Sequence, residues 1–542
     1  MNKIVKYIAG IMLMLSTLSI TSCVDDLNVT PIDPSTQQVF NADSVFVKIY
    51  ANLALTGQQG PSGSGDLANI DEGTSSFIRL IWNLNELSTD EAICSWGDPG
   101  VPELNFNKWT SSHDMVEGLY ARFYFGISMC NLFLTETDGA TDDKIVKQRA
   151  EVRFMRALNY FFLMDMFGNV PFAEVVSTTP PRQIDRADLF VWIESELKTA
   201  LPDMYAAKQA PYYRADEVAA KMLLARMYLN AEVYTGTAKW NEAADYAYQV
   251  MQSGYTLAPD YTHLFVGDNA GTVDNSSVNK APNEIILPIA CDGTYTKSWG
   301  NALYLIASTQ TSGMPAYGTS EGWSGNRARA TLTKKFFPNG VSNDDLNGQD
   351  ATTLITKAGD DRALFWGWNT SESKGVDPIT IASYTQFKQG LSVRKWSNKR
   401  ADGASTKSSQ FVDTDVPLFR AAEANLTYAE AVLRGGAAKG GLSAFDAVNA
   451  LQTRAHVVSP KITSTNISLS LLADEWAREF YFEGRRRMDL IRFGYYGGSN
   501  SYTWDWKGGS AAGSAFSTDY NLFPIPVSDL SVNPNLVQNP GY

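Results

Sequence analysis

The chain has 542 residues, of which 45 are Lys or Arg and 58 are Asp or Glu, so its formal net charge is −13. That acidic balance argues against a nucleic-acid partner, since phosphate binding draws on clustered positive charge. The length allows a large core, in one big domain or in two closely packed ones. Aromatic residues are abundant, with 13 Trp, 25 Tyr and 26 Phe, so we expect some of them to face a ligand.

The first 22 residues have the pattern of a bacterial signal peptide. Lys3 and Lys6 form a basic start, and residues 8–20 form an apolar run that is too short for a stop-transfer helix. Small residues then lead to Cys23, which resembles the lipidation site of a bacterial lipoprotein; ordinary secretory cleavage beside an unrelated cysteine is the alternative. We therefore expect acylation of Cys23 to hold the mature chain, 23–542, at a membrane without a spanning helix.

The remaining cysteines and the histidines predict neither a metal centre nor a hydrolase. If Cys23 is acylated, Cys94, Cys130 and Cys291 remain, and an odd number leaves at least one thiol free unless it pairs with another chain. No two cysteines have the short spacing of a structural zinc site. The three histidines are scattered along the chain, so nothing local supports a histidine metal site or a Ser-His-Asp hydrolase.

Helical periodicity dominates from about residue 44 to about residue 255. The strongest pattern covers residues 144–167, where Ala150, Phe154 and Phe161 share one face. Three further helices are predicted over 187–201, 215–231 and 239–253. The last two contain several alanines that allow close approach, and as a pair they resemble a tetratricopeptide repeat.

The region of residues 259–415 has a different texture. It is rich in Gly, Ser, Thr and Asn and has one strand-like run, 284–289. We expect long loops with short helices and hairpins laid over a helical scaffold. Loops of that length inside a compact protein are usually functional.

Helical patterns return over 417–433, 443–456 and 471–493. The last stretch is the densest in charge and aromatic rings, and it predicts one helix with Trp476 and Phe480 in the core and Glu483 and Arg487 as an ion pair at i,i+4. Glu483 beside three arginines also suggests a catalytic carboxylate in a basic pocket. We favour the alternative of a buried segment whose charges neutralise one another.

Two classes of function fit an exported, acidic, aromatic-rich chain. A glycoside hydrolase needs two carboxylates about 5 to 10 Å apart, but adjacent acidic residues such as Asp90 and Glu91 point in different directions on a helix or strand. A sugar-binding surface needs exposed rings on which pyranose faces stack. Trp96, Trp299 and Trp323 lie beside Gly, Ser or Asn in loop-like sequence, which suits such a surface; packing beneath its own loop is the alternative for each.

Motifs spread over the whole chain are informative when taken together. They are NELSTDE at 85–91, RAEVRFMRAL at 149–158, FGNVPF at 167–172, NEIILPI at 283–289, DEWAREFYFEGRRRMDLIRFG at 474–494 and FPIPVSD at 523–529. With the lipidation motif, they resemble the SusD/RagB family of glycan-binding lipoproteins on the surface of Bacteroidetes. GMPAYGTSEGWSGNRARA at 313–330 and WDWKGG at 504–509 further resemble the starch-binding members of that family.

The resemblance implies a mostly α fold, in which tetratricopeptide-like helix pairs at about 44–255 and 417–493 support a loop-rich glycan-binding region at about 259–415. Residues 23–542 would form a single domain of this type. The same resemblance implies a non-catalytic protein with no required cofactor. It would bind starch or malto-oligosaccharides at the outer-membrane surface and deliver them to a SusC-like TonB-dependent transporter. The same role for a different glycan remains the alternative.

The resemblance also implies an arc of aromatic side chains that follows the curvature of helical α-glucan. By matching flanking sequence, the arc consists of Trp96, Trp299 and Trp323, with Arg79 as a hydroxyl-binding partner. Trp299 replaces a tyrosine of the starch-binding members and so lacks its hydroxyl. The loop after Trp96 is one residue shorter and lacks an expected Asn, for which Asp98 is the candidate substitute.

Calcium is one further expectation that the resemblance carries. Asp413 and Asp415 resemble part of a calcium site of the family, and oxygen ligands suit Ca²⁺. The alternative is a solvated turn rich in Asp.

Overall fold

The computed structural model describes residues 40–271, 278–311, 313–315, 317–346, 351–367, 378–498 and 502–542. The predicted signal peptide and its lipidation site, Cys23, lie outside these ranges. Residues 44–542 form one compact unit that is mostly α-helical. Within the ranges given above, no helix is both long and apolar enough to cross a membrane.

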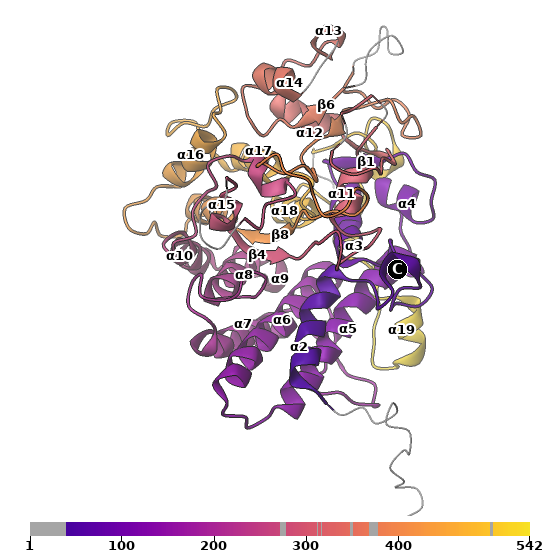
Figure 1. Ribbon diagram of the computed structural model, residues 1–542, viewed down its shortest axis with the longest axis vertical. Coiled ribbons are helices and arrows are strands. Elements are labelled where there is room, and N and C mark those ends of the chain that lie inside the picture. Colours follow the sequence, from indigo (N-terminus) through magenta and orange to yellow (C-terminus); the bar gives the residue numbers. More distant parts are fainter. Residues whose placement is uncertain are drawn as a thin grey trace, which may run out of the picture. The chain divides into compact units, whose positions relative to one another are not determined.

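The helices of the N-terminal half build the lower part of Figure 1. They are α2 (Ala42–Ala54), α5 (Asp114–Glu136), α6 (Asp143–Phe167), α7 (Arg186–Ala200), α8 (Glu217–Leu229), α9 (Ala231–Thr235) and α10 (Trp240–Met251). Helix α6 contacts both α5 and α7, and α8 contacts α10. The predicted helices over 144–167, 187–201, 215–231 and 239–253 are confirmed as α6, α7, α8 and α10.

Local chemistry sets the ends of α6, the longest of these helices. The side chain of Asp142 accepts a hydrogen bond from the N–H of Ile145 (3.1 Å) and caps the first turn. The helix stops at Gly168, whose φ of 75° suits glycine. The helix therefore ends where the predicted pattern over 144–167 ends.

Helix α5 was not predicted, although it has 23 residues. Gly118 and Gly126 weaken its helical signal, because glycine is unfavourable inside a helix. The fold uses both glycines for close packing: a Cβ at Gly126 would lie 2.9 Å from Oδ1 of Asn159 on α6. Tertiary packing thus overrides the local preference.

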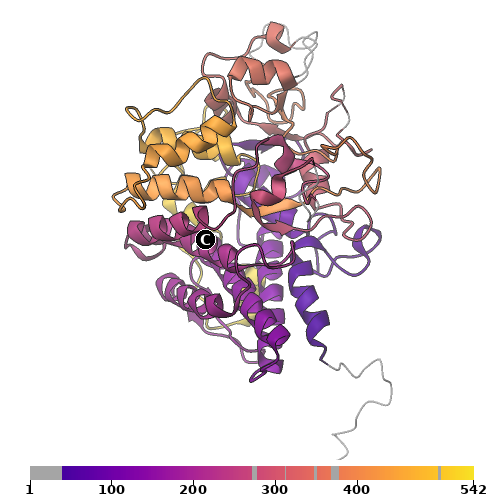
Figure 2. The same ribbon diagram turned by 60° about the vertical axis from the view of Figure 1, so that its left-hand side comes forward.

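A second set of α-helices belongs to the described residues after 420. They are α15 (Ala421–Leu433), α16 (Ala444–Arg454), α17 (Leu469–Phe480), α18 (Arg486–Arg492) and α19 (Val527–Val532). Helix α15 contacts α8, α10, α16 and α17. The C-terminal helices therefore continue the N-terminal scaffold, and Figure 2 shows the orange helices lying beside the magenta ones.

Two details of the C-terminal prediction are wrong. The stretch 471–493 is not one helix, because α17 ends at Phe480 and the chain turns through Phe482 (φ 61°) and Gly484 (φ 76°) before α18 begins. The start of the predicted helix 417–433 is instead strand β8. In both segments, contacts with distant parts of the chain, described below, determine the local structure in place of the helical periodicity.

Short antiparallel strand pairs connect distant parts of the chain. They are β1 (Ala92–Cys94) with β5 (Asn326–Ala328), β2 (Val170–Pro171) with β3 (Gln183–Ile184), β4 (Ile285–Ile289) with β8 (Val416–Arg420), and β6 (Phe365–Trp366) with β7 (Ser392–Val393). Strand β4 confirms the run predicted over 284–289. The pairing of β1 with β5 joins the N-terminal third to the loop-rich region.

The loop-rich region carries short helices, as predicted. They are α11 (Ala302–Ala307), α12 (Ala330–Phe336), α13 (Asn343–Leu346) and α14 (Ala351–Ala358). Upstream of β1 lie α3 (Phe77–Trp82) and a π-helical turn, η4 (Asn83–Leu87), and α4 (Val101–Asn105) follows β1. Helix α3 contacts α11, and this contact places the site described next.

Candidate functional site

Three half-exposed tryptophans, Trp96, Trp299 and Trp323, form what we call the aromatic platform. The ring centroids of Trp299 and Trp323 are 6.3 Å apart, and the ring planes are tilted by 53°. Trp96 packs on Gly325, two residues after Trp323: a Cβ at Gly325 would lie 2.3 Å from the Trp96 indole Nε1. Only glycine suits this position, since its φ is 112°.

Strand pairing explains why Trp96 and Trp323 are neighbours. Trp96 follows β1 and Trp323 precedes β5, and the register pairs Cys94 with Asn326. The N–H of Ser95 extends the ladder by donating to the carbonyl of Gly325 (3.0 Å). Residues more than two hundred positions apart in the sequence are thereby fixed side by side.

Trp299 reaches the platform from the loop before α11. Asn301 caps that helix by accepting a hydrogen bond from the N–H of Leu303 (3.0 Å). The N–H of Trp299 donates to Oε2 of the buried Glu72 (3.1 Å). A Cβ at Gly73 would lie 2.8 Å from Cβ of Trp299, so the backbone at Gly73 packs against the base of this side chain.

Arg79, on α3, lies between the rings and the core. Its guanidinium carbon is 5.9 Å from the Trp96 ring and 4.8 Å from the ring of Tyr304, close enough for cation–π attraction. The Tyr304 hydroxyl donates to Oδ1 of Asn83 (2.5 Å), which holds that ring in place. Arg79 therefore lies beside Trp96 of the aromatic platform, and its role toward sugar hydroxyls stays a prediction.

Asp98 is exposed in the turn after Trp96. Its carbonyl accepts a hydrogen bond from the N–H of Val101 (3.1 Å). Across the described part of the chain, no hydrogen bond or ion pair joins the Asp98 carboxylate to the other predicted site residues. Asp98 thus lies at the edge of the site, next to Trp96.

Several residues of the site were not singled out from the sequence. The ring of Phe411 lies 5.1 Å from that of Trp299. Glu321 accepts hydrogen bonds from the Trp323 indole (2.9 Å) and from the side-chain amide of Gln410 (2.9 Å). Glu321 lies within the quoted motif 313–330, which offered a signal; Phe411 and Gln410 offered none.

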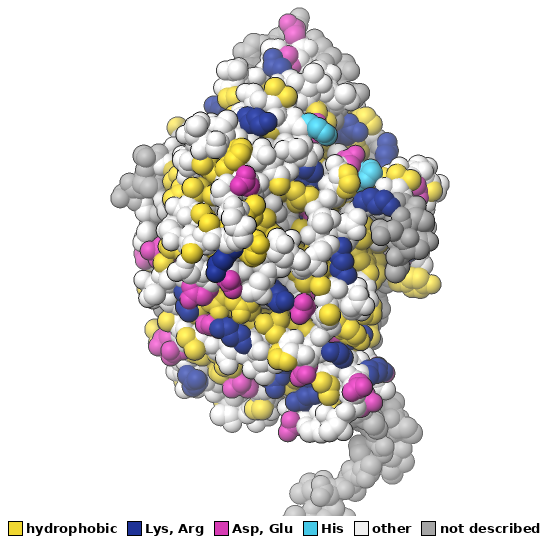
Figure 3. Space-filling view, turned by 90° about the vertical axis from the view of Figure 1, so that its left-hand side faces the viewer, with side chains coloured by type: hydrophobic (Ala, Val, Ile, Leu, Met, Phe, Trp, Pro, Cys, Tyr) yellow, Lys and Arg dark blue, Asp and Glu magenta, His cyan; other side chains and the backbone are white. Residues whose placement is uncertain are grey.

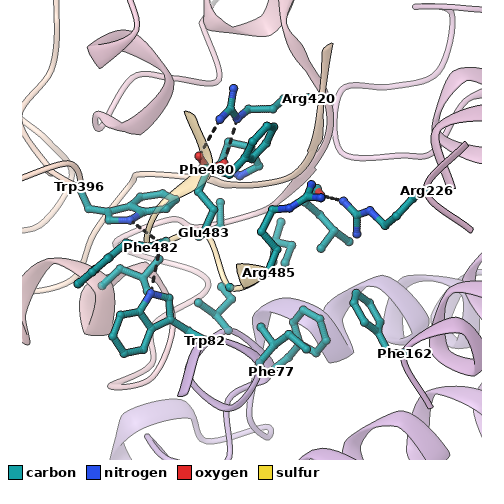
Figure 4. Close-up of a pocket in the computed structure, with 18 residues that line it drawn as sticks. Phe77, Trp82, Phe162, Arg226, Trp396, Arg420, Phe480, Phe482, Glu483 and Arg485 are labelled. Carbon is teal, nitrogen blue, oxygen red and sulfur yellow. Dashed lines mark hydrogen bonds and ion pairs between the residues drawn. The ribbon is translucent and has the colours of Figure 1, made fainter. Parts of the chain in front are cut away.

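Glu483, considered above as a catalytic carboxylate, lines a small cavity that is separate from the aromatic platform. Figure 4 shows Trp82 and Trp396 directed toward Phe482, and both indoles donate to its carbonyl (3.2 and 3.1 Å). Glu483 accepts hydrogen bonds from Lys395 (2.6 Å) and Arg420 (2.8 and 2.9 Å). The cavity holds about 50 Å³, far below the roughly 300 Å³ at which ligand pockets begin.

The charges around this cavity belong to a larger buried network. Glu479 is paired with Arg362 (3.0 Å), Arg420 (2.6 Å) and Arg454 (2.5 Å), and all four side chains are buried. Burial alone would raise the pKa of Glu479, but the three guanidinium groups hold it well below its usual value. The charges therefore neutralise one another, which is the alternative favoured from the sequence.

The predicted intrahelical ion pair does not form in this region. Arg478 pairs with Glu475 (2.8 Å), and Arg487 lies 3.6 Å from Asp165. The pairing of Glu483 with Arg487 was therefore wrong. Its reason is the turn at 481–485, which points Glu483 toward Arg420 instead.

The calcium site expected at Asp413 and Asp415 stays a prediction. Asp413 accepts backbone hydrogen bonds from Gly293 and Lys407 (both 2.8 Å), and Asp415 accepts one from Cys291 (2.7 Å). Burial raises the pKa of Asp415 to about 8. No cluster of three or more metal-binding side chains occurs within the described ranges.

Neither the cysteines nor the surface charges described here indicate a second site. Cys94, Cys130 and Cys291 are buried and unpaired with one another. Figure 3 shows Lys, Arg, Asp and Glu side chains interspersed over one face, with no large area of a single charge.

The fold places the chain in a class of helical-repeat proteins. It resembles a SusD superfamily protein from Parabacteroides distasonis, with a TM-score of 0.65 at 22% identity over 92% of this chain and 98% of the other. It also resembles surface glycan-binding protein A from Bacteroides thetaiotaomicron in complex with laminarihexaose, with a TM-score of 0.65 at 19% identity over 92% of this chain and 98% of the other. Structures of this superfamily share the tetratricopeptide-like helical repeats expected here.

Sequence comparison then assigns the family. A model of the SusD family matches residues 283–542, and a model described as starch-binding and associating with the outer membrane matches residues 27–229. The chain is 42% identical over 559 aligned positions to the starch-binding protein SusD of Bacteroides thetaiotaomicron, with 98% of each chain covered. The chain belongs to the SusD family, whose members are carbohydrate-binding proteins rather than enzymes.

Proposed function

We propose that this protein binds starch and malto-oligosaccharides at the outer-membrane surface without cleaving them, and delivers them to a SusC-like TonB-dependent transporter. Lipidation of Cys23 would supply the anchor. The printed name of the 42% identical relative supports starch, and the outer-membrane description of the matching model supports the location. A different glycan in the same role is the second candidate, since a structural relative is in complex with laminarihexaose.

The observation that carries the proposal is the tilted pair formed by Trp299 and Trp323, with Trp96 beside it. Apolar pyranose faces stack on such rings. The planes of these two rings differ by 53°, so they offer stacking faces of different orientation, which suits a glucan chain that curves from one sugar unit to the next. Arg79 and Asp98 are the proposed partners of the sugar hydroxyls. An open surface of this kind leaves much of the sugar hydrated, so we expect a Kd between roughly micromolar and millimolar.

Calorimetry with maltoheptaose tests this proposal. We expect Trp299→Ala to weaken binding at least about tenfold, as for a central aromatic contact. Trp240→Ala is the matched control, because Trp240 is also half-buried but lies on α10 in the scaffold. No heat with wild-type protein, or equal losses in the two variants, would contradict the proposal.

A panel of polysaccharides in affinity gels separates starch from other glycans. Retardation by amylopectin but not by laminarin supports the proposed substrate, whereas the reverse result supports the second candidate. Incubation with amylose and an assay for reducing ends checks the absence of cleavage: sustained release that disappears on substitution of one carboxylate would restore the hydrolase hypothesis.

A further inference from the structure

Glu321 contacts the aromatic platform through the edge of one ring. The Trp323 indole N–H donates to one carboxylate oxygen, Oε2 (2.9 Å), and the Gln410 amide donates to the other, Oε1 (2.9 Å). Hydrogen bonds to an ionised carboxylate are stronger than those between neutral groups. Each oxygen of Glu321 thus has a protein partner, and the edge of the Trp323 ring is fixed.

Gln410 is also linked to Trp299, through its neighbour in the sequence. Gln410 precedes Phe411, whose ring lies 5.1 Å from Trp299 at an interplanar angle of 52°. Trp299 in turn lies 6.3 Å from Trp323. The contacts therefore form a closed circuit that links the two tryptophans through Glu321, Gln410 and Phe411.

The two loops that carry the circuit are tied together by other bonds as well. The N–H of Ser320 donates to the carbonyl of Ser409 (2.7 Å), and the hydroxyl of Thr319 donates to the carbonyl of Gln410 (2.7 Å). Because these bonds hold the backbone, loss of the Glu321 carboxylate would free the ring of Trp323 without releasing its loop.

We infer that Glu321 and Gln410 are positioning residues of the glucan site, which fix the tilt between Trp299 and Trp323 before the ligand arrives. The inference rests on the proposed function. A tryptophan ring that is already held in its binding orientation loses little conformational freedom when sugar stacks on it. A fixed tilt also favours a curved α-glucan, whereas two mobile rings adapt to chains of any shape.

Glu321→Ala tests the inference by calorimetry with maltoheptaose and a cyclodextrin. We expect about tenfold weaker binding to both, as for loss of one favourable hydrogen bond. Glu321→Gln keeps an acceptor for the indole N–H, and a turned Gln410 amide restores the second bond. We therefore expect Glu321→Gln to restore affinity to within about threefold of wild type.

Circular dichroism of the free protein reports the relative orientation of the two indoles, and a general loss of stability in a protein that is still folded does not change this signal. Two indoles this close and this tilted couple their electronic transitions, which gives paired bands of opposite sign. Trp299→Phe identifies the paired bands by removing them. We expect Glu321→Ala to reduce these bands while the urea midpoint stays near that of wild type.

Glu174→Ala is the matched control, since Glu174 also accepts a hydrogen bond from an indole N–H, that of Trp192 (3.1 Å), away from the platform. This variant should leave the paired bands and glucan affinity unchanged.

If Glu321→Ala keeps wild-type affinity and bands, the inference is wrong and the proposed function stands. If wild-type protein binds no glucan, the proposed function fails. Should Glu321→Ala not fold, loss of affinity in Glu321→Gln would overturn the inference, and retained affinity and bands would support it.

Discussion

The buried charge network and the aromatic platform were both prominent in the sequence. They differ in whether their side chains are fully paired within the chain or remain accessible to a ligand. The carboxylates of Glu479 and Glu483 each meet guanidinium or ammonium groups of the same chain. At the platform, Trp96, Trp299 and Trp323 are held by their edges and neighbours, yet each ring remains half-exposed.

This difference teaches that density of charge is a poor guide to the functional site of this protein. Paired charges in the interior satisfy one another and connect distant helices. Ring faces that the fold supports but does not cover retain binding capacity for an outside ligand. The two regions should therefore respond oppositely to substitution, one in stability and the other in glycan affinity.

The largest expected effect is on the charge network. Glu479→Gln leaves Arg362, Arg420 and Arg454 without their shared carboxylate, so we expect a loss of about 3–5 kcal/mol in the free energy of unfolding. Urea denaturation measures it. Asp474→Asn on the same helix is the control, because its pair with Lys335 is partly exposed and should be worth about 1 kcal/mol or less. Glycan affinity of the folded Glu479→Gln protein should match wild type; a large loss would break the separation of the two regions.

The next effect concerns pH. Burial raises the pKa of Glu86 from its ordinary 4.5 to about 7, although the backbone N–H groups of Gly484 and Arg485 oppose that rise. Below pH 4.5 both folded and unfolded chains hold the proton, and the contribution of Glu86 to stability is complete. As the pH rises through 7 the folded chain must ionise a buried group, so that contribution, up to about 3 kcal/mol, is lost.

Glu86→Gln tests this effect for the pair that Glu86 forms with Glu91, since its amide oxygen can still accept the same backbone hydrogen bonds. Relative to wild type, the variant should gain unfolding free energy between about pH 5 and pH 7, and the difference should level off above pH 7. Glu103→Gln, at an exposed position of α4, should show a constant difference over that range. A constant difference for Glu86→Gln would mean that its carboxyl already ionises normally.

The same substitution, Trp to Ala, can be made in both regions: Trp96→Ala in the aromatic platform and Trp396→Ala beside the buried charge network. Trp96 is half-exposed, and we expect its loss to raise the Kd for maltoheptaose about tenfold with a small change in urea midpoint. Trp396 is 2% exposed, and its loss should cost about 3–5 kcal/mol of stability without changing the Kd. Calorimetry and urea denaturation measure both variants. If Trp96 were only a core residue, Trp96→Ala would lose stability and keep the wild-type Kd.

The smallest expected effect is at Asp98. Its carboxylate is exposed at the edge of the platform, so a hydrogen bond to a sugar hydroxyl there would be worth about two- to fivefold in Kd. Asp98→Ala should show this loss in calorimetry, with no change in unfolding. An unchanged Kd would restrict the site to the three rings and Arg79.

Much of this protein was predictable from local sequence. Helices α6, α7, α8 and α10 follow from apolar residues repeating on one face, because helix geometry places such residues together. The strand-like run at 284–289 and the loop-rich texture after residue 259 were likewise predictable. Motifs conveyed the family and, through it, the three tryptophans.

Tertiary structure alone decided the features that depend on partners distant in the chain. The break between α17 and α18 follows from Phe482, whose carbonyl serves the indoles of Trp82 and Trp396. The 53° tilt of Trp299 against Trp323 depends on strand pairing and on Phe411. Periodicity reports only which side of its own element a residue occupies, whereas angles between rings and pairing of buried charges arise when separate elements pack. The sequence by itself therefore determined the scaffold and its aromatic residues, and packing decided which of them meet at one surface.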